Sequence, residues 1–189
     1  MGAFEFLLLF AAVVLGLAIT DLAISLHRLL SAGARVRWDW LAPLAAIVAL
    51  LKIITQWWSW YLFKAIAGGL TFEMFIVVVV SAILLFLMAA SALPDEVGPG
   101  PFDLRAYYPA VSRRFWLLFA IHWLLITAVA LWAQVVIGKA HLDLVSAAWL
   151  VIPVALFLAI TKSRLWHTVG LVGFIGVYCA QFFGQSLTG

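Results

Sequence analysis

Three side chains in this sequence carry chemistry that apolar surroundings rarely tolerate: Asp21, Lys52 and His122, each inside a long apolar stretch. A charge near the centre of a bilayer costs about 2.5 to 3.5 kcal/mol on insertion scales, so such a residue normally faces other helices and has a partner. Histidine changes charge near neutral pH, and carboxylate–histidine chains form proton relays in membranes. We expect the three to meet, either as a site that moves protons or a small ion, or as an Asp21–Lys52 ion pair that holds helices together.

Polar residues at helical spacing extend this set along the chain. Gln56 and Ser59 follow Lys52 at intervals of four and seven, and Ser25 follows Asp21 by four. Residues at these intervals share one face of a helix, so each group forms a polar stripe. The sequence therefore predicts an intramembrane polar path made of Asp21, Ser25, Lys52, Gln56, Ser59 and His122.

Six apolar stretches must position these side chains. The 189 residues are 67% hydrophobic and 10% charged, which excludes a soluble enzyme, a disordered chain and a nucleic-acid-binding domain, because soluble domains are about 45–50% apolar and about 25% charged. Each stretch can cross about 30 Å of hydrocarbon as a helix, and none has the period-two alternation of a barrel strand. We expect one all-α membrane domain over residues 1–189, a bundle of six transmembrane helices at about 4–30, 40–63, 72–93, 115–137, 142–161 and 165–183.

The loop charges predict the orientation of this bundle. Lys64 and Lys139 fall on one side, and eight basic residues fall on the other: Arg28, Arg35, Arg37, Arg105, Arg113, Arg114, Lys162 and Arg164. An excess of Lys and Arg in short loops marks the cytoplasmic side. Both termini should therefore face away from the cytoplasm, in a multi-pass protein of a bacterial cytoplasmic (inner) membrane. The longest connection, residues 94–112, should lie along the cytoplasmic interface, where Asp103 caps a short segment that includes Leu104 and Tyr108.

Histidines and the single cysteine bear on cofactors. Cys179 is the only cysteine, so the chain can form neither an internal disulfide nor a cysteine metal site. His27 and His167 fall at the same end of the first and sixth stretches, and two such residues can ligate a haem iron, with His122 as an alternate. Histidine is also common at interfaces without any ligand. We therefore expect no cofactor, with haem as the alternative.

Small residues indicate where helices can approach each other closely. Gly176, Ala180 and Gly184 recur at intervals of four on the sixth stretch. Such ladders let helix backbones come into contact. The face serves either packing within the bundle or docking of a second copy or a membrane partner subunit. Apart from the lipid bilayer, these are the partners we expect, and nucleic acid is not among them.

Motifs for enzymatic chemistry are absent from the sequence. There is no nucleotide-binding glycine loop, H-E-x-x-H or G-x-S-x-G motif, and neither paired carboxylates nor an activated nucleophile can be identified. An enzyme is therefore not favoured. The leading expectation is a transporter or channel that moves protons, a small ion or a small solute. The alternatives are a non-catalytic subunit or scaffold of a larger membrane complex and, third, a haem-bearing redox subunit.

Overall fold

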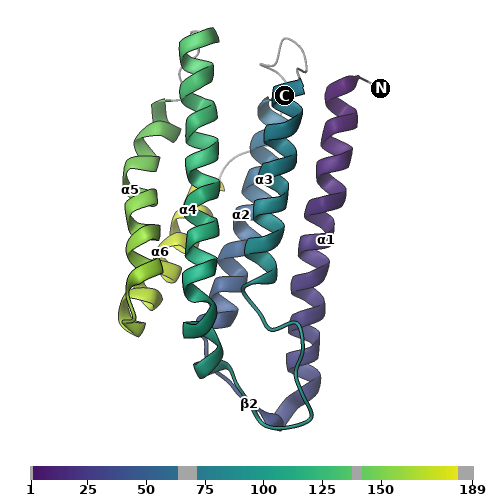
Figure 1. Cartoon of the computed structure of the whole chain (residues 1–189), viewed down its shortest axis with the longest axis vertical. Coiled ribbons are helices and arrows are strands. Elements are labelled where there is room, and N and C mark those ends of the chain that lie inside the picture. The colour runs from purple at the N-terminus through teal and green to yellow at the C-terminus, as the bar shows by residue number, and fades with distance from the viewer. Residues whose placement is uncertain (1, 64–71, 138–141, 183–189) are drawn as a thin grey trace.

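The fold is a bundle of helices (Figure 1). The computed structural model describes residues 2–63, 72–137 and 142–182. Within these residues a helix covers each of the six apolar stretches. Of these, α1 to α4 are long and apolar enough to cross a membrane, and the described part of α5 contains a shorter apolar helix. The helices are α1 (Ala3–Ala32), α2 (Leu41–Phe63), α3 (Phe72–Ala90), α4 (Leu104–Ile137), α5 (Leu142–Ile160) and α6 (Arg164–Phe182).

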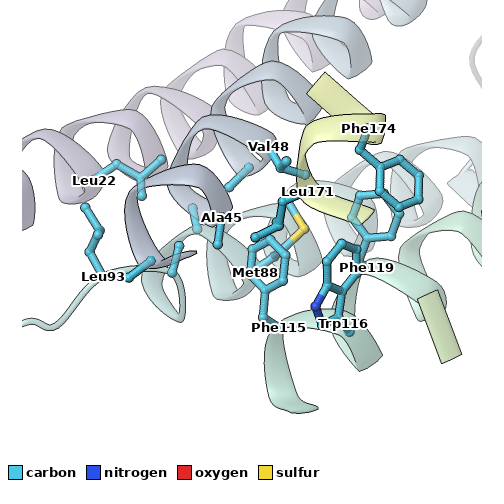
Figure 2. Packing of buried hydrophobic residues seen from close by; sticks show 14 of the residues in the cluster. Leu22, Ala45, Val48, Met88, Leu93, Phe115, Trp116, Phe119, Leu171 and Phe174 are labelled. Atoms are coloured by element: carbon cyan, nitrogen blue, oxygen red, sulfur yellow. The ribbon is translucent and has the colours of Figure 1, made fainter. Parts of the chain in front are cut away.

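The helices lie side by side, and consecutive helices run in opposite directions (Figure 1). α1 packs mainly against α3, which also contacts α4; α4 packs against α5, and α2 packs against α6. Large side chains from three helices fill the centre, and Trp116 meets Phe119 edge to face at 5.5 Å between ring centroids. Figure 2 shows this group, which includes Met88, Phe115, Trp116, Phe119, Leu171 and Phe174.

The outer faces of the bundle are apolar. Val135, Trp149 and Ile160 expose 84, 81 and 76% of their surface, and large apolar side chains are exposed on every helix. Water does not tolerate so much contiguous apolar surface on a monomer, whereas hydrocarbon does. Helix length, hydropathy and this surface together identify an integral membrane protein.

One end of the bundle is rich in arginine, and we call it the basic end. α1 finishes there at Gly33, whose φ of +55° suits a residue without Cβ. A short 3-10 turn, η1 (Gly33–Arg35), leads into β1 (Val36–Arg37), which pairs in parallel with β2 (Phe102–Asp103). The Arg164–Asp39 ion pair ties the start of α6 to the same end. Lys64 and Lys139, expected at the opposite end, lie outside the described residues.

The connection between α3 and α4 is held against α1. Arg28 donates a hydrogen bond to the backbone oxygen of Asp95, and Arg35 donates to the backbone oxygen of Pro99 at 3.2 Å. Each guanidinium thus satisfies a loop carbonyl that no helix or sheet would satisfy. This segment is therefore held against the end of α1.

The start of α4 differs from the sequence prediction. The helix begins at Leu104, so the connection predicted over 94–112 ends at Asp103. Asp103 Oδ1 accepts the backbone N–H of Arg105 at 2.8 Å and caps the helix. Pro109 removes one backbone hydrogen bond but does not end the helix. Leu104 and Tyr108, expected at the interface, are buried in the bundle, and this packing keeps the segment helical through the proline.

Candidate functional site

Lys52 occupies the middle of α2 and is 4% exposed. Its Nζ lies 4.5 Å from the ring centroid of Trp123 on α4. Within the described part of the chain, no carboxylate lies within 4.0 Å of it. A desolvated cation–π contact contributes about 2 kcal/mol. Removing an ammonium from water costs several kcal/mol. The ring therefore compensates only part of the cost of burying a charged lysine.

His122 lies beside this lysine and is 1% exposed. Its Nε2 is 2.9 Å from Ser81 Oγ on α3, and the charge of Lys52 acts on the imidazole at close range. Its Nδ1 is buried without a hydrogen-bond partner. A neutral imidazole has two arrangements here: Nε2 donates to Ser81 and Nδ1 is a bare acceptor, or the serine donates to Nε2 and Nδ1 carries an unused N–H.

Two further polar groups in the core lack partners. Trp123 Nε1 and Tyr178 Oη, on α4 and α6, are both buried without a hydrogen bond. They lie near each other, but their geometry does not meet that of a hydrogen bond. An unmade hydrogen bond of this kind costs about 1 to 3 kcal/mol. With Lys52 and His122, they form what we call the core site: Lys52, Ser81, His122, Trp123 and Tyr178.

The polar stripe predicted on α2 leads from this site toward the surface. Gln56 and Thr55 are both 6% exposed, and Thr55 Oγ1 donates to the backbone oxygen of Lys52 at 3.0 Å. Ser59, one turn further, is exposed and donates to the backbone oxygen of Thr55 at 2.8 Å. The stripe thus begins at the buried ammonium and leaves the bundle at Ser59.

Asp21 does not join the core site. Its half-buried carboxyl group interacts with Asp95 and Arg28, because the connection after α3 is held against the end of α1. Ser25, one turn from Asp21, is buried. The expected Asp21–Lys52 ion pair is not formed, so the arrangement does not support direct proton exchange between Asp21 and His122.

The histidines proposed for haem do not fit that role in the described residues. His167 Nδ1 accepts hydrogen bonds from Tyr108 Oη at 3.0 Å and from Trp116 Nε1 at 3.2 Å, and its Nε2 donates to the backbone oxygen of Thr161 at 3.2 Å. Both ring nitrogens are therefore occupied. His27 is exposed on α1, which packs mainly against α3, whereas α6 packs mainly against α2. The described residues contain no cluster of three or more potential metal ligands.

The small-residue ladder of α6 faces outward. Gly176 and Ala180 are exposed, and a Cβ added at Gly176 would meet no atom within 4 Å. Gly184 lies outside the described residues. By contrast, Gly170 packs so closely on Leu158 that an added Cβ would lie 2.5 Å from Leu158 Cδ1. Contact between α5 and α6 therefore uses Gly170 and leaves Gly176 and Ala180 exposed.

Sequence reasoning did not select Ser81, Trp123 and Tyr178. Ser81 offered a signal, because it is the one polar side chain at the centre of an otherwise apolar stretch. Trp123 and Tyr178 offered none, since aromatic residues are common throughout this chain. Only the packing of α2, α4 and α6 reveals that their polar atoms lie in the core.

No protein family, curated protein or solved structure matches this chain. The chemistry must therefore come from the core site itself. It combines one ammonium, one imidazole and several N–H and O–H donors, without a carboxylate among the described residues. Such a set can bind a charged or polar species, or exchange a proton with one.

Proposed function

We propose that the protein is a membrane transporter or channel for protons, a small ion or a small solute, with the core site and the stripe from Lys52 to Ser59 as its pathway. In this proposal all six helices cross a bacterial cytoplasmic membrane. The basic end faces the cytoplasm, and both termini face away from it. The bias of Lys and Arg toward one end supports this orientation.

The observation that carries the proposal is the buried Lys52, which has no carboxylate partner among the described residues. Replacing a buried charge by a well-packed apolar side chain is often neutral or stabilising, so a lone ammonium has no structural advantage for a bundle of this kind. Ionisable residues within transmembrane helices are rare and commonly mark ion and substrate pathways. The neighbouring His122, with an unpartnered Nδ1, adds a buried ring nitrogen that can donate or accept a hydrogen bond along the pathway.

The polar side chains around the site give the pathway a direction. Gln56 and Thr55 continue from Lys52 to the exposed Ser59. On the other side, the buried Ser25 and the half-buried Asp21 lead toward the basic end. Because the side chains of Asp21 and Lys52 do not pair, we assign them to different parts of the pathway. Lys52 belongs to its centre, and Asp21 belongs to the part that leads to the basic end.

Ion flux into liposomes tests the proposal. The purified full-length protein should conduct protons or a small ion when a concentration gradient and a membrane potential are imposed. Lys52→Met, which keeps the length of the side chain without its charge, should reduce the flux at least tenfold. Lys162→Met removes an exposed lysine at the basic end and should leave the flux unchanged. Equal flux in both variants, or no flux of protons, cations or anions in the unaltered protein, contradicts the proposal.

A second function, a subunit or scaffold of a larger membrane complex, is favoured by one observation. Gly176 and Ala180 are both exposed, and a Cβ added at Gly176 would meet no atom within 4 Å. Such a face allows close approach of another transmembrane helix. A protein of this kind shows no flux on its own and co-purifies with a partner, so the flux experiment also separates the two functions.

A further inference from the structure

The core site combines a buried lysine with several hydrogen-bond donors, and no carboxylate of the described residues forms an ion pair with that lysine. Of all the described Lys, Arg, Asp and Glu residues, Lys52 alone has a buried side chain. The other described carboxylates lie near helix ends or in connections, except for Asp21 inside α1, which interacts electrostatically with Arg28 and Asp95. A desolvated ammonium without a counter-charge is unfavourable, and an anion is the species that would satisfy it.

The groups without partners have the chemistry of an anion site. An indole Nε1 can only donate, and a tyrosine hydroxyl donates readily to an anion. Both Trp123 Nε1 and Tyr178 Oη are buried and unpaired. His122 Nδ1 is unpaired too. It carries an N–H, and is a third donor, in the tautomer in which the Ser81 hydroxyl donates a hydrogen bond to Nε2. Charge-assisted hydrogen bonds of this type are stronger than neutral ones.

Lys52 and Tyr178 both lie at the side chain of Trp123. The ammonium of Lys52 lies over the face of Trp123, Tyr178 lies near the indole nitrogen, and His122 is the preceding residue of α4. A small monovalent anion matches one ammonium and these few donors, whereas a metal cation would meet an ammonium and no carboxylate among the described residues.

We propose that the core site binds a small monovalent anion such as chloride, with Lys52 as its counter-charge and Trp123 Nε1 and Tyr178 Oη as donors. In the absence of the anion, the ring of Trp123 holds the ammonium. When the anion is bound, the ammonium and the two donors turn to it. This inference rests on the proposed transport function and specifies its substrate as an anion. No covalent step is involved.

Chloride binding to the purified full-length protein tests the site independently of transport. The protein in mild detergent is titrated from sodium gluconate to sodium chloride at constant ionic strength, and the chloride NMR linewidth and the unfolding temperature are followed. We expect both to change saturably. Lys52→Met should abolish the effect, and it should still fold because it removes a buried charge. Its unfolding temperature in gluconate checks this.

Two further variants sharpen the result. Tyr178→Phe keeps the ring and removes one hydrogen bond to the anion, so the affinity for chloride should fall about 10- to 100-fold. Lys162→Met should bind chloride like the unaltered protein. An unaltered protein that shows no saturable response to chloride, nitrate or formate overturns the proposal. An equal response in Lys52→Met also overturns it.

Chloride uptake into liposomes separates this inference from the transport function. Uptake that requires Lys52 supports both. Proton or cation flux that proceeds without any permeant anion retains the transport function and overturns the anion site. Saturable chloride binding without any flux retains the site and overturns transport.

Discussion

The contact between α5 and α6 allows a sharp test of the packing, through Gly170→Ala. A Cβ at this position would lie 2.5 Å from Leu158 Cδ1, 3.3 Å from Cδ2 and 3.5 Å from Cγ. Leu158 is buried, so both methyl groups must move into occupied space. Gly173 is one turn further along the same helix, and a Cβ there would meet nothing within 4 Å. It provides the matched control.

The expected magnitude follows from two opposing effects. Overpacking a core contact costs about 1 to 3 kcal/mol. Replacing glycine by alanine inside a helix gains up to about 1 kcal/mol, and this gain applies equally to Gly170 and Gly173. The free energy of unfolding of Gly170→Ala should therefore be about 1 to 3 kcal/mol lower than that of Gly173→Ala.

Unfolding in mixed detergent micelles measures the difference. The fraction folded is followed by tryptophan fluorescence and by circular dichroism while the proportion of denaturing detergent rises. In a Leu158→Ala background the added methyl group has no partner to meet, so Gly170→Ala and Gly173→Ala should then have the same effect. Such a double-mutant cycle isolates the contact between the two residues. If the two alanine variants are equally stable with Leu158 intact, the packing of α5 on α6 described above is refuted.

Two further predictions concern the N-terminal part of α4. Tyr108→Phe removes the hydrogen bond to His167 but leaves Trp116 Nε1 to pair with the imidazole, so the free energy of unfolding should fall by about 0.5 to 1.5 kcal/mol. Tyr107 is half-buried, and its hydroxyl makes no hydrogen bond to the described residues, so Tyr107→Phe serves as the control. An equal loss in both variants would contradict the role given to Tyr108. Asp103→Ala removes the cap and should cost about 1 kcal/mol, whereas Asp103→Asn keeps a capping oxygen and should cost much less. The helix content and the midpoint of unfolding in the same micelle titration check both changes. If Asp103→Asn is as unstable as Asp103→Ala, the effect comes from the exposed Arg37–Asp103 ion pair and not from the cap.

The helices were largely predictable because their signal is local. An apolar run long enough to cross a bilayer must satisfy its backbone within itself, so its helical state follows from composition and length. The boundary that differs most, the start of α4, is set by non-local contacts. Leu104 and Tyr108 are buried against other helices, and Pro109, read locally as a sign of a loop, is tolerated inside the helix.

The candidate site was predictable in part for the same reason. Lys52, His122 and Gln56 stand out in the sequence because polar side chains are rare in such stretches, and all three are buried. The residues that contact them on neighbouring helices could not be predicted from the sequence. Spacing along one helix places residues on a common face, but it does not say which face of a neighbouring helix lies opposite. Asp21 was expected beside Lys52, whereas the connection after α3 brings it to Arg28 and Asp95.

The sequence by itself determines that this chain is an apolar helical protein with a few costly polar residues, because hydropathy and helical periodicity act over neighbouring residues. The tertiary structure alone decides which of those residues meet. Packing of α2 against α4 puts Lys52 on Trp123, and packing of α3 against α4 puts Ser81 on His122. Pairings between helices depend on how whole surfaces fit together, so residues far apart in the chain select their partners only when the bundle forms.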